Sequence, residues 1–170
     1  MGSTYSVLKE LEHARTAFEE AVKIDPNYEE ALYNLGVLEE KTNPTRAVDL
    51  LEKAIQIDPD YAVAHQVLGR LNQSATDLPR AEYHFRRSLE IDPSDYWSYL
   101  YLANLLAVEG KNHEAENMYR LATSLRPEIS SGFTHYANFM DSIGKPQDAA
   151  GIRAKLKNVF DRKPSADHET

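Results

Sequence analysis

The sequence contains no cysteine among its 170 residues. Disulfides, thiolate nucleophiles and cysteine-ligated zinc are therefore excluded. It also has no apolar run approaching the roughly 18 residues that span a bilayer, so we expect no direct membrane insertion. Basic residues are in the minority, since 19 Lys and Arg face 27 Asp and Glu and leave a net charge of −8. That balance disfavours nucleic acid and anionic membrane surfaces as partners, because both require a dense basic footprint.

Sequence motifs for catalysis and cofactor binding are absent as well. The chain has no glycine-rich phosphate loop, no G-x-S-x-G elbow and no H-E-x-x-H. Its six histidines never stand three or four residues apart, so no helical pair has metal-ligand spacing. Neighbouring carboxylates such as Glu19 and Glu20 point apart on a helix. We therefore expect no enzyme activity, no metal site and no cofactor. The compartment stays open, with the cytoplasm as the default expectation.

The sequence does contain an internal repeat. An Ile-Asp-Pro motif ends at Pro26, Pro59 and Pro93, and a related Leu-Arg-Pro motif ends at Pro127, with spacings of 33, 34 and 34 residues. Small and large residues precede each proline in the same phase, which is expected where helices approach closely beside a filling side chain. These in-phase positions are Ala14, Ala47, Ala81 and Ala115, then Phe18, Leu51, Phe85 and Tyr119, then Ala21, Ala54, Ser88 and Ala122.

This pattern resembles the tetratricopeptide repeat family, whose unit is a helix-turn-helix of 34 residues closed by a proline. The resemblance covers roughly residues 10–160. It implies an all-α fold, a right-handed superhelical solenoid of helix-turn-helix repeats. Two turns depart from the family pattern: the one before Pro44 is a residue shorter, and residues 74–77 replace the usual turn glycine. The turns at Gly110 and Gly144 keep that glycine, which suits a left-handed helix cap.

The repeat register also predicts the organisation of the chain. It places the second helix of an incomplete first repeat at 10–24, followed by helix pairs at 28–41 and 44–57, 61–74 and 77–91, 95–109 and 112–125, and 129–143 and 146–160. The repeats lie near 29–61, 62–95, 96–129 and 130–160, the last helix serving as a polar-faced cap. We expect residues 1–9 to be an expression scar and a partly ordered start, and 161–170 to be a disordered tail. Because the leading helix is missing, we expect a fragment of a longer protein, with natural truncation as the alternative.

The resemblance further implies that a protein or peptide partner binds in a concave groove lined by the first helix of each repeat. Counting from residues 29, 62, 96 and 130, positions 2, 5, 6, 9, 12 and 13 share the groove side of that helix. In the third repeat, which is counted from residue 96, these positions are mostly apolar and include the only tryptophan. This predicts an anchor for hydrophobic side chains of a peptide. The candidate groove residues are Tyr33, Asn34, Gln66, Arg70, Trp97, Leu100, Tyr101, Asn104, His135 and Asn138.

Other interpretations of these residues stay open. Trp97, Leu100 and Tyr101 could instead pack against neighbouring repeats. Asn104 and Asn138, which share one repeat position, could either bind a peptide backbone or be solvated. The family's carboxylate clamp needs lysines that no repeat supplies here, so we do not expect acidic chain ends to be bound in that manner. The alternatives to a peptide-binding scaffold are a self-assembling homo-oligomer and a regulatory or substrate-recruiting domain of a larger enzyme.

Overall fold

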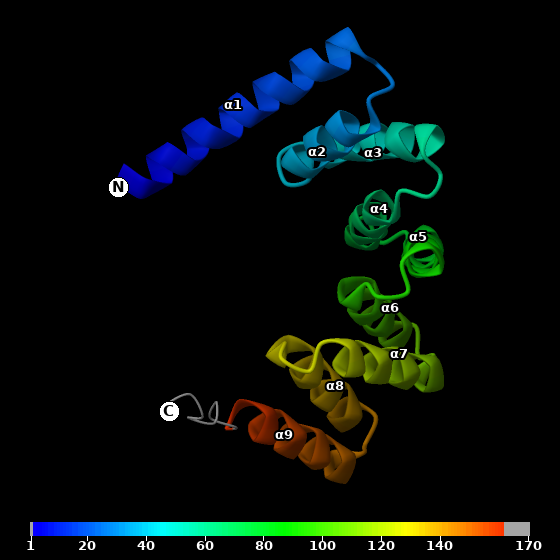
Figure 1. Ribbon diagram of the computed structural model, residues 1–170. Helices are drawn as coiled ribbons and strands as arrows, with labels where there is room; N and C mark the ends of the chain where they lie inside the picture. Colours follow the sequence, from blue (N-terminus) through cyan, green and yellow to red (C-terminus); the bar gives the residue numbers. More distant parts are fainter. Residues whose placement is uncertain (1, 162–170) are drawn as a thin grey trace, which may run out of the picture. The chain divides into compact units, whose positions relative to one another are not determined.

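The chain folds into helices joined by short turns (Figure 1). A computed structural model describes the backbone of residues 2–161 and the side chains of residues 10–159 and 161. Over that range it has nine helices and no strand. These are α1 (Gly2–Ile24), α2 (Glu29–Glu39), α3 (Pro44–Ile57), α4 (Ala62–Ser74), α5 (Leu78–Ile91), α6 (Tyr96–Val108), α7 (Asn112–Leu125), α8 (Ser130–Ser142) and α9 (Pro146–Phe160). The prediction of an all-α repeat solenoid is confirmed. The predicted disordered tail lies outside the described residues, apart from Asp161.

Within the described residues the helices form two compact units, one up to Pro93 and one from Ser94 onward. In the first unit, α2 packs on α3 and α4 packs on α5, while α1 contacts α2. In the second unit, α6 packs on α7 and α8 packs on α9. Each helix therefore pairs with its neighbour along the chain, as expected for stacked hairpins.

Local sequence signals explain where the helices begin. The side chains of Asn43 and Asp77 accept hydrogen bonds from the backbone N–H of Arg46 and Arg80, both at 3.2 Å, and cap α3 and α5. Proline occupies the first turn of α3, α5 and α9, where its missing donor is harmless. From α2 to α9, the predicted helix ends lie within two residues of the observed ones.

Helix α1 differs from its predicted extent, because it begins at Gly2, well before residue 10. The repeat register fixes only those positions that recur in later repeats, so it could not locate this start. No proline precedes Pro26, and nothing else in residues 3–23 is a strong helix breaker.

Small residues let paired helices approach closely. A Cβ atom added to Gly69 on α4 would lie 2.5 Å from Cε1 of Phe85 on α5, and one added to Gly36 on α2 would lie 2.8 Å from Cγ of Leu51 on α3. Phe85 and Leu51 are fully buried beneath these glycines. The repeating small and large positions of the sequence are therefore the contacts that hold each hairpin together.

The turn between α4 and α5 contains an unusual backbone conformation. Thr76 has a φ of 62°, in the left-handed region, as do Gly110 at 74° and Gly144 at 76° in the later turns. The threonine thus occupies the position where the family has glycine, and a β-branched residue is strained there.

Candidate functional site

The predicted groove positions of the third repeat include an exposed aromatic stack on α6. Trp97 is 44% exposed, and its ring stacks on Tyr101 with centroids 6.1 Å apart at 26°. Its other neighbour is the buried Tyr96, whose ring meets it edge-on at 4.9 Å. The Tyr96 hydroxyl lies 3.0 Å from the Ser131 hydroxyl on α8, which fixes the supporting ring. The tryptophan therefore rests on a rigid support while much of its surface stays open to a partner.

Leu100 does not belong to that open surface, and its prediction as a groove contact needs correction. Only 2% of the residue is exposed. Helix α6 contacts both α7 and α8, so it buries residues on more than one side. Leu100 is consequently part of the buried core, as the alternative interpretation allowed for it.

A short polar network joins α6, α7 and α8 beside the stack. The Tyr119 hydroxyl donates to Oδ1 of Asn104 at 2.6 Å, and Nδ1 of His135 lies 3.1 Å from the same oxygen. Burial raises the pKa of Tyr119 to about 12, so this hydroxyl remains a donor at neutral pH. The network thus brings two predicted residues together and engages the amide oxygen of Asn104, leaving its NH₂ group to offer a ligand.

Asn138 lies on α8 in a different setting. Its Oδ1 accepts a weak hydrogen bond from Arg153 of α9 at 3.4 Å, and the residue is exposed. Arg153 also pairs with Asp141 at 2.5 Å. The two asparagines that share a repeat position are therefore held by different partners.

The remaining predicted residues belong to the first unit. Tyr33 is half-buried against Tyr61, with ring centroids 5.2 Å apart, and burial raises its pKa. The Asn34 side chain donates to the carbonyl of Glu30 on its own helix at 2.8 Å. Arg70 on α4 pairs with Glu40 at 2.8 Å. Gln66 is partly buried on the same helix. Arg70 is thus neutralised within the fold rather than left for a ligand carboxylate.

A buried histidine pair in the first unit was not predicted from the sequence. Nδ1 of His65 lies 3.0 Å from Nδ1 of His84, and Nε2 of His65 lies 3.2 Å from the carbonyl oxygen of Pro59. Because that carbonyl can only accept, His65 carries its proton on Nε2 and accepts from His84 through Nδ1. The two residues are 19 positions apart, so only the packing of α4 on α5 reveals the pair.

Burial lowers the pKa of both histidines. That of His84 falls to about 4, to which the nearby His65 and Arg80 also contribute. For His65 the backbone hydrogen bond to Pro59 and the carboxylates of Asp58 and Asp60 oppose the decrease, whereas Arg87 adds to it. Both rings are consequently neutral near pH 7. Among the described residues, no cluster of three or more His, Cys, Asp or Glu could hold a metal ion.

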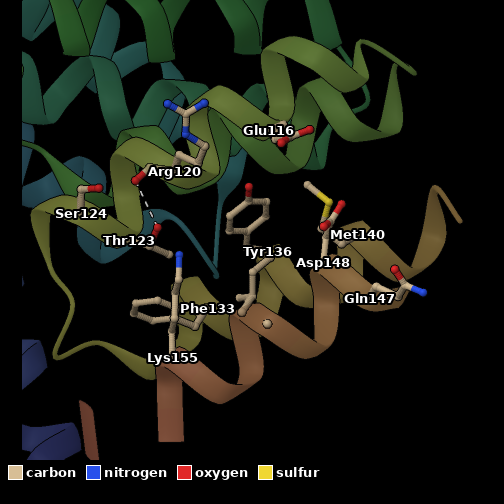
Figure 2. A pocket seen from close by; sticks show the side chains of 12 residues that line it. Glu116, Arg120, Thr123, Ser124, Phe133, Tyr136, Met140, Gln147, Asp148 and Lys155 are labelled. Carbon is tan, nitrogen blue, oxygen red and sulfur yellow. Dashed lines mark hydrogen bonds between the residues drawn. The ribbon is translucent and has the colours of Figure 1, made fainter. Parts of the chain in front are cut away.

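The structure also contains a cavity that sequence reasoning missed. It has a volume of about 600 Å³ and lies between α7 and α9, above α8 (Figure 2). None of the predicted groove residues lines it. The one sequence signal is Gly151 inside α9, since a glycine within a helix often has a packing reason.

Comparison with known sequences decides the family. A family model described as "TPR repeat" matches residues 2–42. Two family models described as "Tetratricopeptide repeat" match residues 30–61 and 84–117. The chain belongs to the tetratricopeptide repeat family. Its helix pairs are therefore tetratricopeptide units, as the spacing of the Ile-Asp-Pro motifs predicted.

Solved structures share this tetratricopeptide fold. A crystal structure of MamA is 21% identical, covers 93% of each chain and has a TM-score of 0.80. YrrB, described as a TPR protein with an unusual peptide-binding site, is 21% identical with a TM-score of 0.72, over 98% of this chain and 84% of that chain. At these identities the likeness is one of fold.

A curated relative is much longer than this tetratricopeptide chain. Protein O-mannosyl-transferase Tmtc1 of Drosophila melanogaster is 30% identical over 92 residues, which are 54% of this chain and 11% of that protein. The chain thus spans only a small part of the relative's length. None of the helices over the described residues is both long and apolar enough to cross a membrane.

Proposed function

We propose that this chain is a protein-interaction scaffold that binds a peptide or protein segment on the α6 face of its groove. The observation that carries the proposal is the exposed Trp97, stacked on Tyr101 and supported by the buried Tyr96. Tryptophan and tyrosine dominate binding hot spots, because a rigid ring buries a large area at a small entropic cost. An isolated exposed aromatic needs no explanation, whereas a supported stack is suited to receive an apolar side chain.

Polar groups of the second unit flank this stack and complete the proposed surface. The amide of Asn104, His135 and Asn138 can bind backbone groups of an extended peptide lying across α6 and α8. By repeat register Tyr33, Asn34, Gln66 and Arg70 lie on the corresponding face of the first unit, and their part in binding stays a prediction.

The comparisons support this class of function. Tetratricopeptide proteins typically bind other proteins or peptides, and the description of YrrB names a peptide-binding site. The match to part of an O-mannosyl-transferase favours a second candidate function, a segment that recruits substrate for a larger enzyme. The sequence of the gene tests that alternative. A catalytic domain encoded beside the repeats would support it, and a gene without one would contradict it.

Affinity capture with paired variants tests the scaffold function. Trp97→Ala combined with Tyr101→Ala should remove at least about nine tenths of the captured partner, because hot-spot truncations typically weaken binding more than tenfold. Tyr83→Ala is the matched control, as this tyrosine is 61% exposed but lies on α5, away from the proposed surface.

Circular dichroism of the variants keeps the result interpretable. Both should keep native helicity, because none of the removed rings belongs to the fully buried core. Unchanged capture by the double variant would contradict the proposal, and equal loss in the Tyr83 control would show a nonspecific effect of removing aromatics.

A further inference from the structure

The cavity between α7 and α9 has a counterpart in the first unit, which makes an internal comparison possible. The repeat register relates the two units by 68 residues, as Ala47 and Ala81 correspond to Ala115 and Ala149. By this register, two hollows of about 390 and 480 Å³ between α3 and α5 correspond in the second unit to the cavity of about 600 Å³ and to a smaller hollow of about 300 Å³ lined by Phe133, Lys155, Asn158 and Val159.

The two units differ at one position that lines these hollows. Tyr83 borders both hollows of the first groove, which lies between α3 and α5, and the corresponding residue in the second groove, between α7 and α9, is Gly151. A Cβ atom added to Gly151 would meet no atom within 4 Å. The cavity of about 600 Å³ is therefore open at this position, because the chain supplies no side chain where the first unit has the Tyr83 ring.

The floor of the second groove is also more apolar than that of the first. Phe133 of α8 and Ile152 of α9 correspond to His65 and His84, which bond to each other in the first unit. Tyr136 and Met140 extend this floor along α8. The second groove can thus desolvate an apolar group where the first has a satisfied polar pair.

The two grooves also differ in whether their basic side chains are paired with carboxylates. In the first unit Arg87 is neutralised by Asp60 at 2.5 Å and by Glu90 at 3.1 Å. Its counterpart Lys155 and Arg120 of α7 form no ion pair with any side chain that the structure describes, and Arg120 donates a hydrogen bond to the amide oxygen of Asn117 at 3.4 Å.

The two cations mark one end of the cavity. Figure 2 shows Arg120 and Lys155 extending from α7 and α9 at the same end, with Glu116 and Asp148 at the other. Glu116 is already paired with Lys145 at 3.2 Å. Asp148 forms no ion pair with any side chain that the structure describes, so one unpaired carboxylate at its end stands against two unpaired cations at the other. The unpaired charge of the cavity is therefore positive at the end marked by Arg120 and Lys155, although the whole chain carries −8.

We propose that this second groove is a separate docking site for a partner segment that presents an aromatic side chain flanked by acidic residues. The ring occupies the space that Gly151 leaves open above Phe133 and Ile152. The flanking carboxylates pair with Arg120 and Lys155 at the rim. The site lies on α7, α8 and α9 and does not rest on the proposed α6 surface.

A peptide titration followed by NMR of the ¹⁵N-labelled chain tests this site. The probe is the end-blocked peptide Glu-Glu-Phe-Glu-Glu, compared with Glu-Glu-Ala-Glu-Glu and Lys-Lys-Phe-Lys-Lys. The first peptide should shift amide signals of α7 and α9, while the other two should bind at least about tenfold more weakly, because each lacks one of the two anchors. Nonspecific attraction cannot produce this order, since the chain itself is acidic.

Matched variants locate the binding. Gly151→Tyr, which copies Tyr83, should weaken binding at least about tenfold, whereas Ala150→Tyr on the exposed side of α9 should not. Arg120→Glu with Lys155→Glu should also abolish it, whereas Lys157→Glu, outside the cavity, should have little effect. The Trp97 and Tyr101 double variant should bind as wild type, which separates this site from the α6 surface.

Several results would overturn the proposal. These are no signal shifts with the aromatic acidic peptide, equal binding of the alanine peptide, or wild-type binding by Gly151→Tyr. Shifts of the same signals with protein concentration alone would make a second copy of the chain the occupant, and would equally overturn it.

Discussion

At the scale of single residues, the His65 and His84 pair couples the stability of the first unit to pH. The pKa of His84 is about 4 in the folded chain, against an ordinary value of 6.5. Between these values the unfolded chain binds more protons than the folded one, so stability decreases as the pH falls through this window. Protonation would also place two N–H groups against each other where one proton is now shared.

We therefore expect the free energy of unfolding to fall by on the order of 2–3 kcal/mol from this pair between pH 6.5 and pH 4. Urea unfolding across that range measures the effect. The control combines His65→Phe with His84→Ile, the residues that occupy the corresponding positions of the second unit. This variant should show a flatter pH dependence, and parallel curves would exclude the pair as the cause.

Thr76 leads to a second prediction at this scale. Its φ of 62° is unfavourable for any residue with a Cβ atom, so Thr76→Gly should raise the free energy of unfolding by about 1 kcal/mol. Thr76→Ala removes the branch but keeps the Cβ atom, and should gain clearly less. Thermal or urea unfolding distinguishes the two, and a destabilised glycine variant would contradict the strain.

The sequence identified the turn in which Thr76 lies as a departure from the repeat, but it gave no sign of the histidine pair. Residues 74–77 stand where the repeat has its turn glycine, so the departure was visible from the register alone. His65 and His84 occupy unrelated repeat positions, and their contact depends on how α4 packs against α5. Register identifies equivalent positions, whereas contacts between different positions require the three-dimensional structure.

At the scale of helices, the α4–α5 hairpin depends on a glycine that has no room for a side chain. Gly69→Ala should lower the free energy of unfolding by about 1–3 kcal/mol, because the new Cβ atom would lie 2.5 Å from the buried Phe85 ring. Gly151→Ala is the control, since it has free space and replaces a helix-weakening glycine. It should leave stability unchanged or raise it, and equal losses would contradict the packing argument.

A buried carboxylate of α2 helps to attach helix α1. Glu39 of α2 is 2% exposed and accepts hydrogen bonds from Arg15 of α1 and, at 3.3 Å, from Arg46 of α3. Glu39→Ala should lower the free energy of unfolding by about 2–3 kcal/mol, since it removes the buried carboxylate that binds Arg15 and leaves that guanidinium only Glu12, at 3.8 Å. Hydrogen exchange in α1 should accelerate most.

Glu19→Ala provides the comparison for Glu39. Glu19 pairs with Arg46 at 3.0 Å on the exposed surface, so its loss should change stability by less than about 1 kcal/mol. If the two substitutions had equal effects, Glu39 would not be the attachment point of α1.

The sequence predicted where the helices begin and end, but it predicted only in part which residues of a helix are buried. Proline spacing and capping residues located both ends of α3, α7 and α9. The groove positions also identified Trp97 and Tyr101, which form a stack on α6. Leu100 was assigned to the same surface because helical geometry gives the direction in which a side chain points, yet the residue is buried. When a helix packs on two neighbours, the angular position of an apolar residue around that helix does not decide whether the residue lies in the groove or in the core.

At the scale of the whole molecule, the family and its repeat architecture were predictable and the second groove was not. The repeat spacing identified the hairpins, because each unit repeats the same contacts. The cavity beside Gly151 exists because this residue has no side chain to fill the space between α7 and α9. An internal comparison of the two units reveals it, since Tyr83 occupies the matching position.

The most direct test of the scaffold function uses Trp97 as a reporter. As the only tryptophan it provides all tryptophan emission, and at 44% exposure it is accessible to acrylamide. A peptide from the captured partner should shift this emission to shorter wavelength and protect it from quenching, with light scattering showing one copy of the chain throughout. Emission and quenching that stay unchanged when the partner peptide saturates the chain would contradict binding at the α6 surface.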